Sequence, residues 1–186
     1  MNAFARVDKE TFLRFASEHA EERYEYVRGR IVQQMTGGTR NHSLIVRRLA
    51  AAIERQIDSE SLLLLTDRGV DIESIIRYPD IVVEPSDEPG NSLMTGRSAI
   101  IVEVLSPSTS SNDLDVKPAE YLSIASLDVY LIASQSEPAL LLFERSPDGT
   151  FPQVPREIEG RASRATFSGR GFRVTLDLKS IYEGVS

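Results

Sequence analysis

The segment Ala99–Leu105 constrains the fold more than any other part of the sequence, because it is an apolar run with a single charge, Glu103, inside it. Apolar and β-branched residues in unbroken succession are typical of a strand that is buried on both faces of a sheet. The segment therefore predicts a central strand. An isolated carboxylate there would bind a proton rather than stay charged, so Glu103 has either a buried partner or a place at a cleft.

A second carboxylate precedes another apolar run. Asp80 ends the sequence Tyr78-Pro79-Asp80, directly before the β-prone segment Ile81–Val83. Because proline fixes the backbone direction just before it, the Asp80 carboxylate is expected to project from the end of a strand. This placement is typical of a metal ligand and also of an ordinary turn residue.

Helical patterns occur in three places. Helices are predicted from the Asp8 N-cap to about His19, from the Thr39 N-cap to Ile57, and from about Asp113 to Ala125. Proline is costly outside the first turn of a helix, so Pro118 indicates that the third helix starts near Lys117.

The remaining segments are β-prone and are bounded by Gly, Pro and Ser. Tyr24–Met35 predicts a hairpin that turns at Arg28-Gly29. Further strands are predicted at Leu62–Leu65, Val70–Ile72, Ile81–Val83, Val129–Ala133, Leu140–Phe143, Phe151–Val154 and Phe172–Leu176. Strands interspersed with helices predict a mixed central sheet flanked by helices, in an α/β domain that borders on α+β. We expect residues 1–186 to form a single domain.

Composition excludes several kinds of site and of location. The chain has no cysteine, so it contains no disulfide, no thiolate zinc site and no catalytic thiol, and any metal must bind through oxygen or imidazole. No apolar run is long enough for a signal peptide or a membrane span, which predicts a cytoplasmic protein without a membrane partner.

The charge is unevenly distributed along the chain. The net charge of −7 argues against simple electrostatic binding to nucleic acid. Residues 61–144 carry fourteen acidic and four basic side chains, whereas residues 1–60 carry nine and ten. An acidic centre is most simply a solvated surface, and it also suits a cation-binding site.

Four segments together resemble the PD-(D/E)XK nuclease superfamily, most closely a branch of restriction endonuclease-like proteins of unknown biological role. The similarity extends over nearly the whole chain. It rests on Tyr24-Glu25 with the Arg28-Gly29 turn and His42, on Tyr78–Val83, on Ile101–Thr109 with its unbroken EVLSPST string, and on Asp113, Lys117 and Tyr121 at intervals of four residues.

The resemblance implies a restriction endonuclease-like core with an N-terminal helix and hairpin extension. It implies that Asp80, Glu103 and the carbonyl of Val104 bind Mg²⁺ or Mn²⁺, and that a metal-activated water hydrolyses DNA. It also implies a homodimer, the commonest closed oligomer.

The usual lysine of the superfamily is absent, since Leu105 stands at its position. The resemblance implies that Lys117, from the following helix, takes over as a catalytic residue, and that Glu25 is an extra ligand or a base. It also makes Arg40, His42 and Tyr121 candidate substrate contacts. Plainer interpretations are a solvated lysine, a surface glutamate in a hairpin, a helix-capping histidine and a packed tyrosine.

Two other functions remain open. The leucine at the usual lysine position and the acidic net charge would also fit a catalytically silent module that binds nucleic acid or serves in assembly. Paired carboxylates also hydrolyse glycosides, but the chain has no tryptophan to bind a sugar ring.

Overall fold

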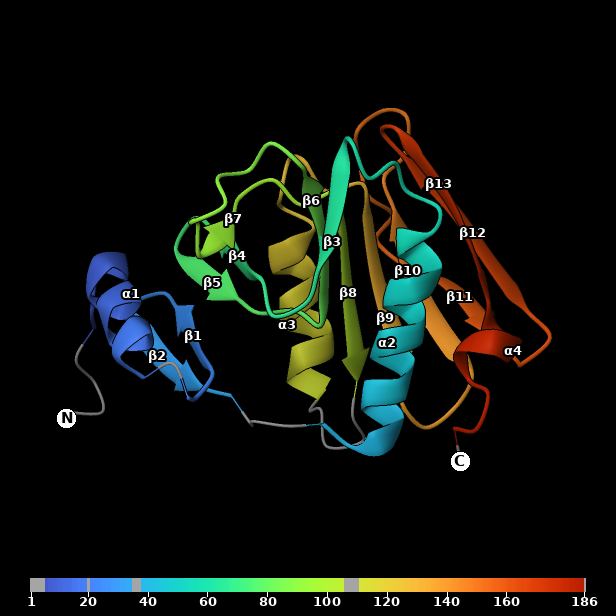
Figure 1. Ribbon diagram of the computed structural model, residues 1–186, viewed down its shortest axis with the longest axis horizontal. Coiled ribbons are helices and arrows are strands. Elements are labelled where there is room, and N and C mark those ends of the chain that lie inside the picture. Colours follow the sequence, from blue (N-terminus) through green and yellow to red (C-terminus); the bar gives the residue numbers. More distant parts are fainter. Residues whose placement is uncertain (1–5, 20, 35–37, 106–110, 186) are drawn as a thin grey trace.

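The centre of the molecule is a six-stranded sheet in the order β11-β10-β9-β8-β6-β3 (Figure 1). The computed structural model describes residues 6–19, 21–34, 38–105 and 111–185, with the side chains of residues 111–115 excepted. Only β8 and β9 are parallel among the neighbouring pairs, so the sheet is mixed, as predicted. Its strands are β3 (Leu62–Leu65), β6 (Ile81–Pro85), β8 (Ile100–Leu105), β9 (Val129–Ser134), β10 (Ala139–Glu144) and β11 (Arg156–Glu159).

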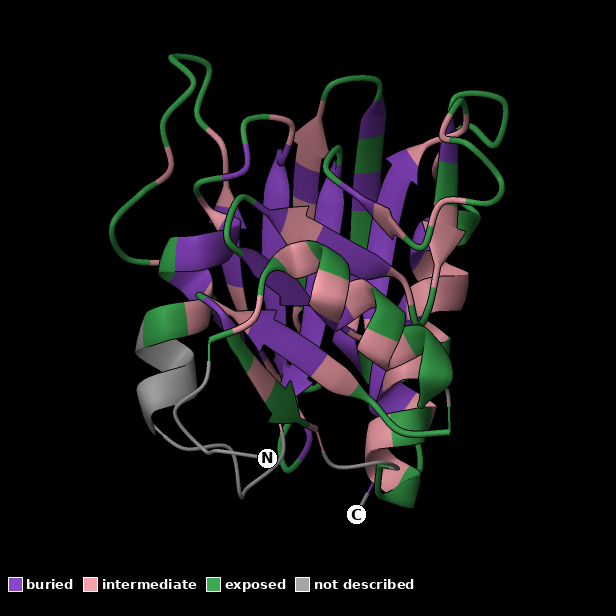
Figure 2. Cartoon of the chain, turned by 90° about the vertical axis from the view of Figure 1, so that its left-hand side faces the viewer, coloured by how far each residue is buried: buried purple, intermediate pink, exposed green. Residues whose placement is uncertain are grey.

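Both faces of this sheet are covered, which is why β8 is apolar on both sides. Val102 and Val104 face a core that α2 (Arg40–Glu54) and the hairpin of β12 (Arg164–Gly169) and β13 (Phe172–Asp177) complete, together with α4 (Leu178–Ile181). Ile101 faces a second core beneath α3 (Ser111–Tyr121), which connects β8 to β9. Figure 2 shows the strands of the sheet buried over most of their length.

A second sheet, in the order β2-β1-β5-β4-β7, lies beside the first (Figure 1). Its strands are β1 (Tyr24–Val27), β2 (Arg30–Gln33), β4 (Gly69–Ile72), β5 (Ile75–Arg77) and β7 (Met94–Thr95). Phe12 of α1 (Lys9–Glu18) packs with Tyr26 of β1 and Ile76 of β5. The N-terminal helix and hairpin are therefore held against the strand that leads into Asp80.

Local signals in the sequence are confirmed where they depend on near neighbours. The Asp8 carboxylate accepts from the Thr11 backbone N–H at 2.7 Å, and the Thr39 hydroxyl accepts from the His42 N–H at 3.2 Å, so both are N-caps. Arg28 and Gly29 have positive φ angles of 50° and 87°, which a two-residue hairpin turn of type I′ requires.

The third helix begins close to the predicted Asp113, whereas the alternative start near Lys117 and the end at Ala125 are wrong. The helix begins at Ser111 and ends at Tyr121, so Pro118 lies in its interior rather than in its first turn. A proline there removes one helical hydrogen bond, at a cost of about 3 kcal/mol. Pro118 is buried, and Tyr121, one turn later, is fully buried in the core under α3. Burial of this helix face offsets the cost of the proline.

Several strand boundaries also differ from the prediction. Residues 151–154 form no strand, and the next strand is β11, which pairs with β10 from Ala139↔Glu159 to Leu142↔Arg156. Pro152 and Pro155 lack the N–H that a ladder needs, which explains the displacement. The second helix ends at Glu54, before Ile57. Strands β5, β7 and β12 and the helix α4 were not predicted.

The architecture is a mixed α+β fold, on the α+β side of the predicted border. In the described ranges, no helix has the length and apolar character that crossing a membrane would require.

Candidate active site

Asp80 and Glu103 lie side by side at one end of the central sheet. Strands β6 and β8 are antiparallel with Ile81 opposite Val102, and continuing this register by one residue places Asp80 opposite Glu103. The backbone N–H of Val104 donates to Asp80 Oδ2 at 2.7 Å, which fixes that carboxylate against β8. The pairing of two strands thus brings together two acids that are far apart in the sequence.

Glu103 has the buried partners that an acid in an apolar strand requires. Its Oε1 accepts from Lys117 Nζ at 3.2 Å and from the Tyr121 hydroxyl at 3.0 Å. Burial raises the pKa of the Glu103 carboxyl, the charge of Lys117 opposes that rise, and the nearby charge of Asp80 adds to it. The Asp80 and Glu103 carboxylates therefore repel each other when both are ionised.

Lys117 and Tyr121 approach Glu103 from the same face of α3, as expected for residues four apart on a helix. The Lys117 side chain is 17% exposed, so it is not a solvated surface lysine. Burial lowers the pKa of Lys117. The carboxylates of Glu103 and Glu25 raise it by more than burial lowers it, so the net shift is upward. Tyr121 is fully buried and packs on Tyr130 with 5.1 Å between ring centroids. It is both a packed tyrosine and a hydrogen-bond donor to the site.

His42 reaches the site from the first turn of α2. Its Nε2 lies 3.3 Å from Asp80 Oδ2. The hydrogen bond to Asp80 raises the pKa of His42, burial opposes the rise, and the charges of Asp80 and Glu103 and a hydrogen bond to the Val104 backbone support it. This shift favours protonation of the imidazole beside the two carboxylates. The Val104 backbone, predicted as a ligand, lies in the same cluster.

Arg40 does not join this cluster. It is the first residue of α2 and is exposed to solvent. A long, charged side chain next to the site is compatible with a substrate contact, which stays a prediction.

Glu25 is buried in a separate ion-pair network. Only 1% of the residue is exposed, so it is not a surface glutamate. Arg77 Nη1 donates to its Oε2 at 2.5 Å, and Gln34 Nε2 donates to the same oxygen at 2.8 Å. Arg77 also donates to Glu120 Oε2, from Nε at 2.9 Å. Glu25 therefore contacts Arg77 rather than Asp80, although its charge still acts on Lys117.

Sequence reasoning missed Arg77 and Glu120. Arg77 links the N-terminal hairpin to α3, and Glu120 lies one turn from Lys117 on that helix. One signal was present: Arg77 is a charge at the end of the short β-prone run Ile75-Ile76, just before Asp80. Its pairing with Glu25 joins residues from separate strands, and no local pattern indicates it.

The donor chemistry of the cluster suits a hard divalent cation. Asp80 and Glu103 supply carboxylate oxygens that repel each other, and a cation would neutralise that repulsion. Across the part of the chain that the structure describes, no three His, Cys, Asp or Glu side chains form a ligand set on their own. Mg²⁺ usually keeps several waters and binds through one or two carboxylates, so two acids are sufficient.

Comparison with known proteins points to one family. A family model named Uma2 and described as "Putative restriction endonuclease" matches residues 9–177. Two uncharacterized proteins of Synechocystis sp. are also similar. One is 30% identical over 151 residues, covering 78% of each chain, and the other is 29% identical over 125 residues, covering 63% of this chain and 70% of that one.

The fold is shared with a solved structure from Anabaena variabilis, described as a putative nuclease belonging to DUF820. The two superpose with a TM-score of 0.73 and cover 97% of this chain and 99% of the other, at 16% sequence identity. At this identity the likeness establishes the fold.

Proposed function

The chain belongs to the Uma2 family, and from this membership and the pairing of Asp80 with Glu103 we propose that it is a metal-dependent endonuclease that hydrolyses phosphodiester bonds in DNA. The observation that carries the proposal is the position of the two carboxylates at one sheet end, with the Lys117 ammonium 3.2 Å from Glu103. Two carboxylates can hold a divalent ion that acidifies a bound water, and an ammonium group can stabilise the negative charge that develops on the phosphoryl oxygens.

Asp80 and Glu103 would hold the cation, Mg²⁺ or Mn²⁺, with the Val104 carbonyl as a further oxygen donor. When bound, such an ion polarises a phosphoryl oxygen and acidifies a coordinated water. The Val104 N–H keeps Asp80 oriented toward β8. Lys117, held by Glu103, carries positive charge beside the place where negative charge develops on the phosphorus oxygens.

The remaining side chains orient these groups. Tyr121 donates to the same Glu103 oxygen as Lys117 and so limits the rotation of the carboxylate. When it is protonated, His42 beside Asp80 attracts a phosphate, and Arg40 at the start of the same helix extends this attraction outward. The charge of Glu25 raises the pKa of Lys117, so Glu25 acts through that lysine rather than as a metal ligand.

The test is cleavage of supercoiled and linear duplex DNA by the purified protein in Mg²⁺ or Mn²⁺. Activity is expected to disappear with a chelator and in Asp80→Ala, and to fall by about two orders of magnitude or more in Lys117→Met. Arg14→Ala, on the exposed face of α1, is the matched control and should cleave normally. Cleavage that survives both the chelator and Asp80→Ala would contradict the proposal.

A second candidate is a silent module that binds nucleic acid without cutting it. Leu105 at the usual lysine position favours it, because the site then has no lysine in β8. Lys117 is already paired with Glu103. DNA binding that is unaffected by Mg²⁺, without any cleavage, would support this candidate.

We also propose that the protein is a homodimer, because closed two-fold pairs are the commonest oligomers and suit cleavage of two strands. Light scattering after size exclusion should give twice the 20.7 kDa mass of the chain. A monomeric mass across the concentrations used for cleavage would contradict this.

A further inference from the structure

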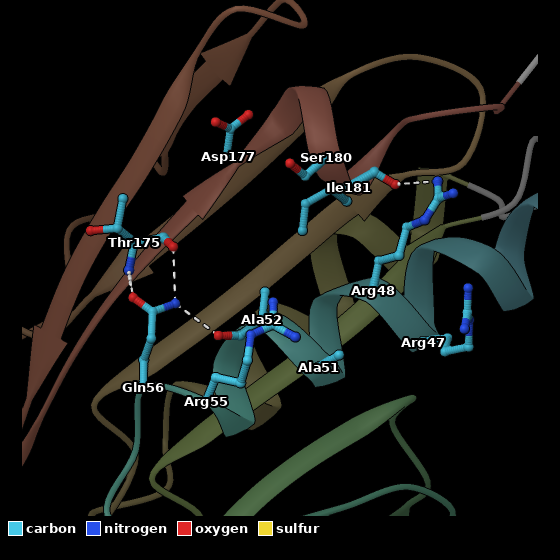
Figure 3. A pocket seen from close by; sticks show the side chains of 10 residues that line it. All are labelled: Arg47, Arg48, Ala51, Ala52, Arg55, Gln56, Thr175, Asp177, Ser180 and Ile181. Atoms are coloured by element: carbon cyan, nitrogen blue, oxygen red, sulfur yellow. Dashed lines mark hydrogen bonds between the residues drawn. The ribbon is translucent and has the colours of Figure 1, made fainter.

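A groove of about 330 Å³ lies between α2 and the β13–α4 segment (Figure 3). Asp80 and Glu103 are not among the residues that line it. Three arginines of α2 line it, Arg47, Arg48 and Arg55, and the opposite wall carries the polar side chains of Thr175, Asp177 and Ser180. The guanidinium groups make the groove positively charged, over a lining to which Ala51, Ala52 and Ile181 add apolar atoms.

Hydrogen bonds connect the two walls of the groove. Arg48 Nη1 donates to the carbonyl of Ile181 at 3.2 Å and to the carbonyl of Glu183. Gln56 accepts from the Thr175 N–H at 2.9 Å and donates to the Thr175 carbonyl at 3.0 Å (Figure 3). These contacts hold α2 at a fixed distance from β13. The groove is therefore formed before anything binds in it.

The charges of Arg47 and Arg55 are not neutralised within the described residues, where neither side chain has an ion pair, and both are exposed. Asp177 is the one acid on the groove wall. It accepts from the Lys179 N–H at 2.9 Å, and its other oxygen lies 3.5 Å from Arg164 Nε. The acid is therefore already compensated, and the groove is net positive.

The helix α2 connects this groove to the candidate active site. His42, in its first turn, contacts Asp80, whereas Arg47 and Arg55 lie farther along the same helix. At 1.5 Å per residue, Arg47 is about 8 Å and Arg55 about 20 Å along the axis from His42. A nucleic-acid strand rises about 3.4 Å per nucleotide, so the axial part of the second distance alone corresponds to roughly six nucleotides.

We infer that this groove binds the phosphodiester backbone of duplex DNA that flanks the scissile bond. The inference rests on the proposed function and extends it to a substrate contact outside the catalytic cluster. Arg47 and Arg55 neutralise phosphates, and the Ser180 hydroxyl donates to them. The Thr175 hydroxyl is paired with that of Thr166 at 3.0 Å and takes no part. The groove thus gives a chain with net charge −7 a local positive surface for phosphates.

Binding is measured by fluorescence anisotropy in EDTA, with labelled duplexes of about 8 and about 30 base pairs, so that no cleavage is needed. The variants are Arg47→Ala, Arg55→Ala, the double variant, and the charge-preserving Arg47→Lys/Arg55→Lys. Arg14→Ala removes one exposed arginine from α1, an element that lies far from α2 and β13 (Figure 1), and is the control for net charge.

For the double alanine variant we expect affinity for the long duplex to fall about tenfold at low salt, and the slope of log affinity against log salt to become about 2 units less steep. The lysine variant should bind nearly as well as the wild type. A duplex of about 8 base pairs still spans the roughly six nucleotides to Arg55, so Arg55→Ala should weaken its binding nearly as much as that of the long duplex. Equal losses in Arg14→Ala, or unchanged binding in the double variant, overturn the inference. So does a wild type that fails to bind the long duplex.

The outcomes separate this inference from the nuclease proposal. If the double variant binds DNA more weakly than the wild type but the wild type does not cleave DNA in Mg²⁺ or Mn²⁺, the inference about the groove stands and the nuclease proposal is refuted. If the wild type and the double variant both cleave DNA and bind it with equal affinity, the nuclease proposal stands and the inference about the groove is refuted. A change of oligomeric mass in the double variant, with unchanged DNA affinity, would assign the groove to a subunit contact instead and also refutes the inference.

Discussion

At the scale of single residues, the centre of the molecule depends on charges that satisfy one another. Arg77 compensates Glu25 and Glu120, while Lys117 compensates Glu103. These groups come from β1, β5, β8 and α3, so their ion pairs connect both sheets to the helix that carries the lysine. Removing one member leaves a buried charge without its counterion, which costs more than the pair contributes.

Arg77→Met tests this dependence. The variant leaves Glu25 and Glu120 facing each other without a cation, and we expect its free energy of unfolding to fall by roughly 3 kcal/mol. Urea denaturation followed by circular dichroism measures the change. A variant in which Glu25→Gln and Glu120→Gln accompany Arg77→Met should recover part of the loss, because no charge is then left unpaired. A loss below about 0.5 kcal/mol in the single variant would show that the network contributes little.

The contact between His42 and Asp80 predicts a dependence on pH. Asp80 raises the pKa of His42 above its usual value. The contribution to stability is therefore fully present below the pKa of an unfolded histidine, about 6.5, and is lost as the pH rises through the higher folded pKa. In EDTA, Asp80→Asn should destabilise the protein more at about pH 6 than at about pH 9. Equal losses at both pH values would contradict the assignment, and NMR titration of His42 checks the pKa directly.

At the scale of elements, the start of α2 has two structural roles. Thr39 caps the helix by accepting from the His42 N–H, and its hydroxyl also donates to Gln135 Oε1 at 3.0 Å, beyond the end of β9. The cap thus fixes the start of α2 and the position of His42, which contacts Asp80. Loss of the cap is expected to loosen the first turn and move His42 away from Asp80.

Thr39→Ala should lower the free energy of unfolding by about 1 kcal/mol, the usual effect of losing an N-cap. Thr39→Ser keeps the hydroxyl and is the matched control, with little change expected. Chemical denaturation measures both. Should the alanine variant be as stable as the serine variant, the cap would not be what holds this end of α2.

At the scale of the whole molecule, folding creates a carboxylate pair that a divalent cation can stabilise. An ion that binds the native state and not the unfolded chain raises stability by RT ln(1 + [L]/Kd), about 2.7 kcal/mol at a hundred times the dissociation constant. Mn²⁺ is therefore expected to raise the Tm of the wild type, as measured by differential scanning fluorimetry. Glu103→Gln should lose this rise, while Arg77→Lys, whose charge is preserved, should keep it. A rise of equal size in Glu103→Gln would place the ion elsewhere.

The sequence alone was sufficient for features that depend on neighbouring residues. The apolar run around Glu103 predicted the central strand, Asp8 and Thr39 predicted their helix starts, and Arg28-Gly29 predicted the turn. Each of these follows from periodicity, capping or backbone conformation over a few residues. The placement of Asp80 at the start of a strand was predictable in the same way.

Only the tertiary structure decided what depends on distant partners. It placed Asp80 opposite Glu103 through strand register, paired Arg77 with both Glu25 and Glu120, and let packing around Tyr121 keep Pro118 inside α3. It also formed the arginine groove from α2 and β13. These arrangements arise from contacts between segments far apart in the chain, whose free energy outweighs local preference and leaves no local pattern in the sequence.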